Sequence, residues 1–309
     1  MRILDKFRHG KGTGQLYHIK CSLDHCTFKT PTVGSVLCDN DNSCHALEKC
    51  EGVENPLSME DFTEWELRDI QPHIPAIHAI IRQMNIQDIV VKLRSKKSNE
   101  EHNPQNEFRV SERVSDINGF IRIIGVFDNP NVADDDTNKH IVVMPYIHGG
   151  SLMQFQPTSD KILKSLITQA TLSLAEAFLK YGFIHPCLHW CNVLLETTDD
   201  AEVSYEIGTG TITVMTHGHK VIITELNKAY TRVYEPSQFW YFLRRFYVGH
   251  LDIYRKQDTV RDWNSEMITS KYYEKTEPIT HEDLTDIVEL IQKSTFHYWD
   301  IPSHSTKSV

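Results

Sequence analysis

The stretch from Phe183 to Leu195, FIHPCLHWCNVLL, constrains the fold more than any other part of this 309-residue chain. Before it, residues 160–181 carry apolar side chains at the spacing of one helical face. These are Ile162, Leu163, Leu166, Ile167, Ala170, Leu174 and Phe178. Gly182 follows, where a C-terminal cap is expected, and residues 193–195 form a short apolar run typical of a buried strand. The sequence therefore predicts a helix, a loop and a short strand in this order.

The loop resembles the protein-kinase catalytic loop, H-R-D-L-x-x-x-N. His185, Leu188 and Asn192 occupy its first, fourth and eighth positions. Pro186 replaces the arginine, and Cys187 replaces the aspartate that would accept the proton of the substrate hydroxyl. A thiol is mostly protonated at neutral pH and does not reproduce the geometry of a carboxylate. The resemblance implies a kinase fold in which Cys187 is an inactive replacement for the catalytic aspartate.

The wording LHWCN also resembles the haspin family of atypical protein kinases, whose loop reads H-R-D-L-H-W-G-N. His189 and Trp190 match that pattern, and Cys191 replaces its glycine. Residues 203–223 resemble the strand-rich insert of this family, and LDIYR at residues 251–255 resembles its D-I-Y-R motif. The resemblance implies an α+β, two-lobed fold with a small, mainly β N-lobe that includes helix αC and a larger, mainly helical C-lobe.

This fold implies four segments. We expect an N-terminal extension over residues 1–56, an N-lobe over 57–145, a C-lobe over 146–302 and a tail over 303–309. The aromatic run at residues 239–250 is expected to be a helix that faces the core, and residues 283–294 are expected to form a closing helix.

Composition limits the class of protein. The chain is 40% hydrophobic and 24% charged, as is usual for a globular protein, and its seven cysteines suit a reducing compartment. No apolar run reaches the roughly 18 residues of a membrane span, and no signal peptide is recognisable. We expect an intracellular protein, nuclear or cytoplasmic. The net charge of −10 argues against direct nucleic-acid binding and suits a basic peptide partner.

The first 56 residues contain two candidate binding motifs. GKGTG at Gly10–Gly14 could be a phosphate loop, but no apolar strand precedes it and its spacing is not G-x-G-x-x-G. A group of cysteines and histidines could bind zinc, but it contains no C-x-x-C pair. Its members are Cys21, Cys26, Cys38, Cys44, Cys50, His18, His25 and His45. A loosely packed extension is therefore expected.

Lys92 in VVKL occupies the position of the strand-three lysine of kinases, which binds the α and β phosphates of the nucleotide. Counting back from it places the phosphate-covering loop at residues 70–79. The three glycine positions there hold Gln71, His73 and Ala76. Since glycine allows the backbone to approach phosphates closely, such a loop is expected to bind triphosphate poorly.

The rest of the nucleotide site follows from the same resemblance. Glu107 is expected to be the αC glutamate that pairs with Lys92, and Glu112 is the alternative. The hinge, whose backbone would hydrogen-bond adenine, is expected at residues 144–147, which include Met144 and Tyr146.

The metal-binding aspartate of the family, in I-I-D-Y-T, corresponds to IITEL in this chain. Thr224 aligns with the aspartate directly, and Glu225 aligns with it after a slip of one residue. A threonine hydroxyl is a weak ligand for Mg²⁺, which prefers carboxylate oxygens. Asn192, the second metal ligand of the kinase pattern, is retained.

Two functions follow. The first is a haspin-like pseudokinase that binds a protein or peptide, with ATP and Mg²⁺ as cofactors that bind weakly. The second is a divergent ATP-dependent serine/threonine kinase that acts on a basic, histone-tail-like peptide. His185 and His189 complete the candidate catalytic residues, and His189 could in principle accept a proton. An unrelated α/β domain with chance motifs is a third interpretation.

Overall fold

The computed structural model describes residues 5–8, 15–21, 26–27, 88–95, 104–128, 139–153, 155, 157–254, 275 and 277–293. These residues form a mixed α+β fold with small antiparallel sheets. They divide into two compact units. The first unit holds the described residues up to Asp116, with Phe120–Gly150 and Ile223–Ala229. The second unit holds Ile117–Gly119, Ser151–Ile222 and the described residues from Tyr230 onward.

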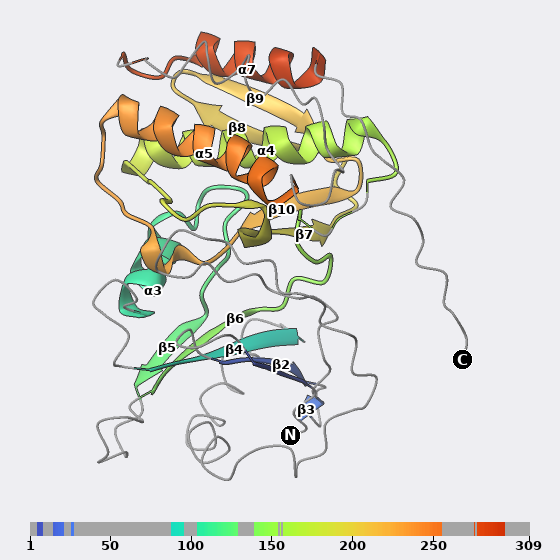
Figure 1. Cartoon of the computed structure of the whole chain (residues 1–309), viewed down its shortest axis with the longest axis vertical. Coiled ribbons are helices and arrows are strands. Elements are labelled where there is room, and N and C mark those ends of the chain that lie inside the picture. Colours follow the sequence, from blue (N-terminus) through green and yellow to red (C-terminus); the bar gives the residue numbers. More distant parts are fainter. Residues whose placement is uncertain are drawn as a thin grey trace. The chain divides into compact units, whose positions relative to one another are not determined.

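The first unit is built on one antiparallel sheet (Figure 1). Its strands are β1 (Asp5–Arg8), β2 (Gln15–Cys21), β3 (Cys26–Thr27), β4 (Asp88–Ser95), β5 (Gly125–Asp128) and β6 (Lys139–Pro145). Their order is β1-β2-β4-β6-β5, and β3 pairs with β2. Strand β4 is central, with Lys92 opposite Leu16 on one side and Val142 on the other. Pairing on both sides fixes the backbone of Lys92 within the sheet.

The N-terminal strands differ from the loosely packed extension expected over residues 1–56. β1 and β2 pair with Arg8 opposite Gln15, so residues 9–14, which lie outside the described residues, connect two neighbouring strands. The short sequence of β1, DKFR, is too polar for an apolar pattern to reveal a strand. The expected phosphate-covering loop at residues 70–79, residues 38–50 with their cysteines, and the tail at 303–309 lie outside the described residues.

Helix α3 (Pro104–Arg113) precedes β5 in the first unit. It buries Pro104, Glu107, Val110 and Ser111. The helix αC that Glu107 was expected to belong to is therefore α3. Strand β6 corresponds to the apolar segment before the expected hinge, and the chain passes from the first unit to the second after Gly150.

The second unit is built around helix α4 (Figure 1). Its other elements are α5 (Pro236–Tyr254), α7 (His281–Lys293), the 3-10 turn η4 (Trp190–Asn192), β7 (Val193–Thr197), β8 (Glu202–Ile207), β9 (Gly210–Met215) and β10 (His219–Ile223). α4 spans Asp160–Tyr181 and contacts β8, β9, α5 and α7. The strands expected in the insert are the β8–β9 hairpin and β10, which pairs with β7.

Helix α4 is surrounded by the second unit rather than lying on its surface. Its side chains are almost continuously buried from Leu163 to Phe178. In the described part of the chain it is the helix long and apolar enough by composition to cross a membrane, and 83% of its most apolar window is buried in the protein. It ends at Gly182, whose φ of 59° and N–H bonds to Ala177 and Phe178 form the cap expected from the sequence.

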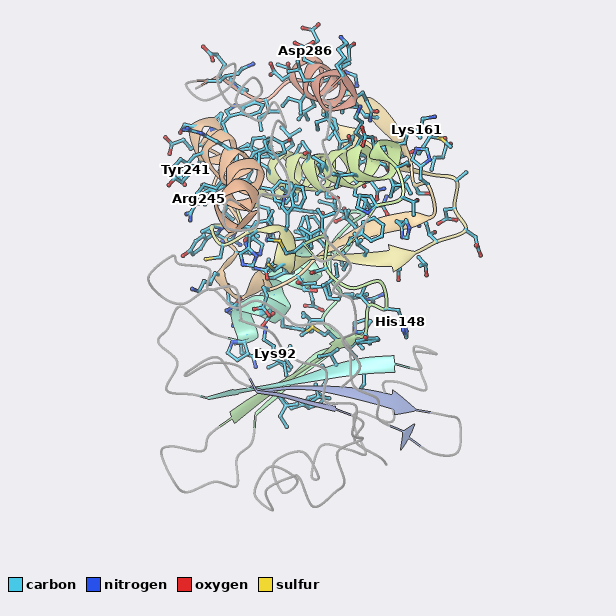
Figure 2. The ribbon with its side chains drawn as sticks, turned by 45° about the vertical axis from the view of Figure 1, so that its right-hand side comes forward. Lys92, His148, Lys161, Tyr241, Arg245 and Asp286 are labelled. Atoms are coloured by element: carbon cyan, nitrogen blue, oxygen red, sulfur yellow. The ribbon has the colours of Figure 1, made fainter. Side chains whose placement is uncertain are left out.

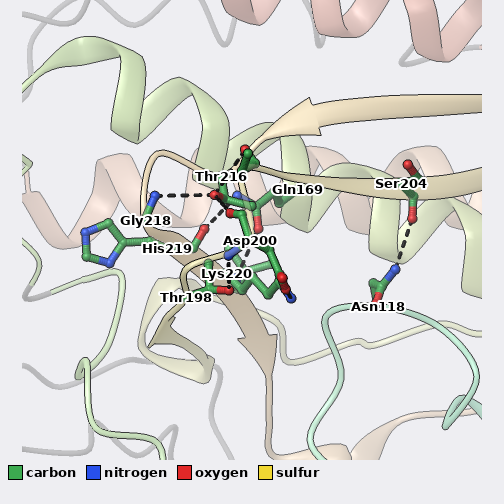
Figure 3. Close-up of polar contacts among 11 residues, drawn as sticks. Asn118, Gln169, Thr198, Asp200, Ser204, Thr216, Gly218, His219 and Lys220 are labelled. Carbon is green, nitrogen blue, oxygen red and sulfur yellow. Dashed lines mark hydrogen bonds and ion pairs between the residues drawn. The ribbon is translucent and has the colours of Figure 1, made fainter.

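Polar side chains fix the insert to α4 (Figure 3). Gln169 donates to the carbonyl of His219 at 3.0 Å and accepts from the N–H of Val221 at 3.2 Å. Lys220 forms an ion pair with Asp200. The hydrogen bond from Lys220, and then its positive charge, lower the pKa of the exposed Asp200 carboxyl. The bonds of Gln169 join α4 to β10, and the ion pair joins the chain before β8 to β10.

Helices α5 and α7 complete the second unit. α5 buries the aromatic residues Phe239, Trp240, Phe246 and Tyr247, in agreement with the core-facing helix expected there. Tyr241 and Arg245 lie on its outer side (Figure 2). α7 begins with a capping box, in which the Asp283 carboxylate accepts from the Thr280 N–H and the Thr280 hydroxyl accepts from the Asp283 N–H.

Candidate functional site

Three side chains from distant parts of the sequence meet in the first unit. Lys92 lies on β4 (Figure 2). Its Nζ lies 3.4 Å from Glu107 Oε1 on α3 and 2.6 Å from Glu225 Oε1. The side chains of Lys92 and Glu107 are only 5% and 1% exposed, and that of Glu225 is 29% exposed. We call these three residues the lysine site. The ion pair expected between Lys92 and Glu107 is therefore present, whereas Glu112 is exposed.

Glu225 has an unusual backbone conformation. Its φ of 59° and ψ of 43° place a non-glycine residue in the left-handed region, which is uncommon and is found at functional sites. It follows β10 and precedes the 3-10 turn η5 (Leu226–Lys228). The preceding residue, Thr224, is buried. The Glu225 carboxylate contacts Lys92, and the role of Thr224 or Glu225 as the metal ligand stays a prediction.

The lysine site offers an ammonium for phosphate oxygens and a carboxylate for a Mg²⁺ ion that is bound to those phosphates. An ammonium in a desolvated position attracts phosphate oxygens strongly, and a carboxylate oxygen is the ligand that Mg²⁺ prefers. In the described part of the chain no group of three or more His, Cys, Asp and Glu side chains forms a metal site. A Mg²⁺ ion at Glu225 would therefore depend on phosphate oxygens and water for its other ligands, as is usual for this ion.

The expected adenine-binding segment continues from β6 in the same unit. Met144 lies in β6 opposite Val90 of β4, two residues from Lys92. Tyr146 follows the strand, and its ring lies edge-on to His148 at a centroid distance of 4.7 Å. Their role in binding adenine stays a prediction.

The residues of the expected catalytic loop lie in the second unit. His185 and His189 are buried and Cys187 is half-buried. Asn192 donates its side-chain amide to the carbonyl of Cys187 at 3.1 Å, and its N–H bonds to the carbonyl of His189 at 2.9 Å. These bonds fold residues 187–192 into a tight loop before β7. Within the described part of the chain, no side chain hydrogen-bonds to the Cys187 thiol.

The apolar side chains of this loop anchor it in the second unit. Trp190 and Cys191 are buried, and the Trp190 ring lies 6.4 Å from that of Phe246 on α5. Cys191, which replaces the glycine of the haspin pattern, therefore fills space in the core. The loop is also joined through its start, where Ile184 and Tyr230 exchange backbone hydrogen bonds of 2.9 and 2.8 Å.

The glycine-rich segment GKGTG lacks the spacing of a phosphate loop, but its place between two strands is informative. Residues 9–14, HGKGTG, connect β1 and β2, and β2 lies beside the strand that carries Lys92. A strand therefore precedes the glycines, although it is polar, and their spacing still differs from G-x-G-x-x-G. The signal was present in Gly10, Gly12 and Gly14, but β1 is too polar to be recognised as a strand, and the pairing of β2 with β4 spans too many residues for a local pattern to reveal it.

Comparison with known proteins agrees with this arrangement. Residues 58–234 match the ABC1 atypical kinase-like domain. A stretch of 101 residues is 34% identical to the serine/threonine-protein kinase haspin of Mus musculus. That alignment covers 32% of this chain and 13% of the mouse protein. The chain therefore belongs to the family of ABC1 atypical kinase-like domains, within the protein-kinase-like superfamily, and is a distant, partial relative of haspin.

Proposed function

We propose that this chain is a kinase-like domain that binds ATP with Mg²⁺, transfers phosphate poorly, and acts mainly by binding a protein or peptide. The observation that carries the proposal is the lysine site, in which Lys92 is paired with both Glu107 and Glu225. Nucleotide binding and weak phosphate transfer are supported by different residues.

Nucleotide binding is supported by residues of the first unit. Lys92 would bind phosphate oxygens, Glu107 would hold the lysine in place, and Glu225 would supply a carboxylate for Mg²⁺. When bound, the metal ion would neutralise the charge of the phosphates. Residues 9–14, which include three glycines, connect β1 and β2, and β2 pairs with the strand that carries Lys92. We therefore propose that the first unit binds nucleotide although the glycine positions expected at residues 70–79 hold other residues.

Weak phosphate transfer is supported by Cys187. In kinases the aspartate at this position accepts the proton of the attacking hydroxyl. A positioned general base contributes about 10²- to 10⁴-fold to a rate, so the replacement leaves a domain in which nucleotide can bind while transfer is slow. Asn192, at the second metal-ligand position of the motif, is retained.

The partner follows from charge. A protein of net charge −10 attracts basic peptides by long-range electrostatics. We propose a basic protein or peptide partner and an intracellular, nuclear or cytoplasmic, location.

Nucleotide binding can be tested by thermal denaturation of the purified full chain. ATP with Mg²⁺ is expected to raise the melting temperature, and Lys92→Ala is expected to abolish the shift because the phosphates lose their cation. Lys220→Ala is the matched control, since Lys220 also forms an ion pair but lies in the second unit. An unchanged melting temperature of the wild type at millimolar ATP and Mg²⁺ would refute nucleotide binding.

A second candidate is an active serine/threonine kinase, and it is favoured by Glu225. The Glu225 carboxylate lies at the lysine site, where it would serve as the metal ligand. On this candidate the chain would lack the catalytic aspartate but keep a carboxylate for the metal. Transfer of radioactive phosphate from ATP to a basic histone-tail peptide, abolished by Glu225→Gln, would establish this candidate instead.

A further inference from the structure

The backbone that carries Glu225 is held by a side chain of helix α3. Asn106 donates its side-chain amide to the carbonyls of Asn227 and Ala229, both at 3.2 Å. A carboxamide has two N–H donors, so one side chain can satisfy both carbonyls. Asn106 is the immediate neighbour of Glu107, the other carboxylate of the lysine site. The same helix therefore presents one carboxylate to Lys92 and holds the segment that presents the other.

These two carbonyls lie at a point that needs support. Asn227 is within η5, and Ala229 closes this turn with an N–H bond to Leu226 at 3.0 Å. A turn this short cannot satisfy its last carbonyls internally. Glu225, directly before it, has a left-handed conformation that an ordinary L-residue keeps only when its surroundings impose it. Asn106 contacts the chain two and four residues beyond that position.

The chain before Glu225 is held by a second side chain of α3. Ser111 donates to the carbonyl of Ile121 at 2.8 Å and accepts from the N–H of Ile123 at 2.7 Å. The N–H of Ile121 in turn donates to the carbonyl of Ile223 at 2.9 Å. Ser111 and Ile223 are both buried. Glu225 is therefore bracketed, with Ile223 fixed on one side through Ser111 and Asn227 fixed on the other by Asn106.

We infer that Asn106 is a positioning residue, which keeps the Glu225 carboxylate at Lys92 by holding the η5 backbone against α3. The hydrogen bonds of Asn106 to the η5 backbone do not depend on nucleotide. The importance of Asn106 for metal binding rests on the proposed function. Because the same α3 carries Glu107 and Asn106, a displacement of the helix would remove both carboxylates from Lys92 together.

The reactivity of the Lys92 amine tests this inference without nucleotide. The full chain is treated with an amine-acylating reagent, and labelling of Lys92 is followed by mass spectrometry. Asn106→Asp keeps the size of the side chain but replaces the donor with a negatively charged acceptor. It is expected to raise the labelling rate about fivefold or more, the factor that the loss of one ordinary hydrogen bond allows. Glu225→Gln is expected to raise it similarly, because it removes the charge that holds the amine.

The double variant distinguishes positioning from general loosening. If Asn106 acts through Glu225, Asn106→Asp combined with Glu225→Gln labels Lys92 no faster than Glu225→Gln alone. Asn118→Asp is the matched control, since Asn118 also donates its amide to a backbone carbonyl, that of Ser204 at 3.0 Å, but in the second unit (Figure 3). It should leave Lys92 labelling unchanged. If Asn106→Asp does not fold, Asn106→Ala is measured in its place.

Two results would overturn the inference: labelling of Lys92 within twofold of wild type in the Asn106 variant, or effects of the two substitutions that multiply. Binding of ATP with Mg²⁺ to the wild type is measured in parallel. A chain that shows the expected labelling pattern but binds no nucleotide contradicts the proposed function and leaves the role of Asn106 intact. A chain that binds nucleotide but lacks the labelling pattern contradicts the role of Asn106 and leaves the proposed function intact.

Discussion

At the scale of single residues, the lysine site contains two carboxylates in different environments. Glu107 is buried within α3, while Glu225 retains some access to solvent at the start of η5. A buried ion pair whose partner is removed leaves an uncompensated charge, which is strongly destabilising. Glu107 is therefore suited to remain paired with Lys92. The more accessible Glu225 is suited to leave Lys92 and bind a metal ion instead.

The proposed replacement of the catalytic aspartate by Cys187 allows a direct test at the same scale. Cys187→Asp supplies a carboxylate at the position of the missing base and is expected to raise phosphate transfer to a basic peptide about 100-fold or more over wild type. Incorporation of radioactive phosphate measures the rate. Cys187→Asn is the control, because it has the shape of aspartate without its basicity. A wild-type rate equal to that of Cys187→Asp would show that Cys187 does not limit transfer.

At the scale of elements, the end of α4 depends on one glycine. A Cβ atom at Gly182 would lie 2.6 Å from the backbone nitrogen of Val233, and φ is +59°. Gly208 has a similar φ of +61° but open space around it. We expect Gly182→Ala to lower the free energy of unfolding by more than the roughly 1–2 kcal/mol that a left-handed L-residue costs, and Gly208→Ala to lower it by about that cost alone. Urea denaturation compares the two, and equal losses would show that the contact with Val233 relaxes without cost.

The elements differ in how far the sequence could predict them. α4, its glycine cap and α7 were predictable because their apolar spacing and caps are local. β1 was not, because DKFR has no apolar alternation and becomes a strand only by pairing with β2. The choice between Thr224 and Glu225 was open for a related reason. It depends on a contact with Lys92, which is 133 residues earlier in the chain.

At the scale of the whole molecule, the kinase-like superfamily was predictable from a few fixed letters, whereas the ABC1 family and the layout of the N-terminal region were not. The letters HWCN and the preceding helix suffice to identify a kinase-like chain, because catalytic loops are short and continuous in sequence. A sheet is assembled from strands separated by many residues, so its order cannot be read from one segment. The division at residue 56 depends on such an order, and strands of the first 27 residues lie in the sheet that carries Lys92.

The part that these strands play can be tested by truncation. Removing residues 1–27 takes away β1, β2 and β3, and it leaves β4 unpaired along its register with β2, from Leu93 opposite Gln15 to Asp88 opposite Lys20. Backbone hydrogen bonds contribute about 1 kcal/mol each, so the loss is several kcal/mol of a total stability that is about 5–15 kcal/mol in ordinary domains. The exposed edge of β4 would also promote aggregation.

We therefore expect the truncated chain to melt at a clearly lower temperature in calorimetry and to be less soluble, whereas removal of residues 303–309 should change neither property. If the chain without residues 1–27 melts like the full chain, the first strands are dispensable and residues 1–56 are an extension, as their sequence suggested.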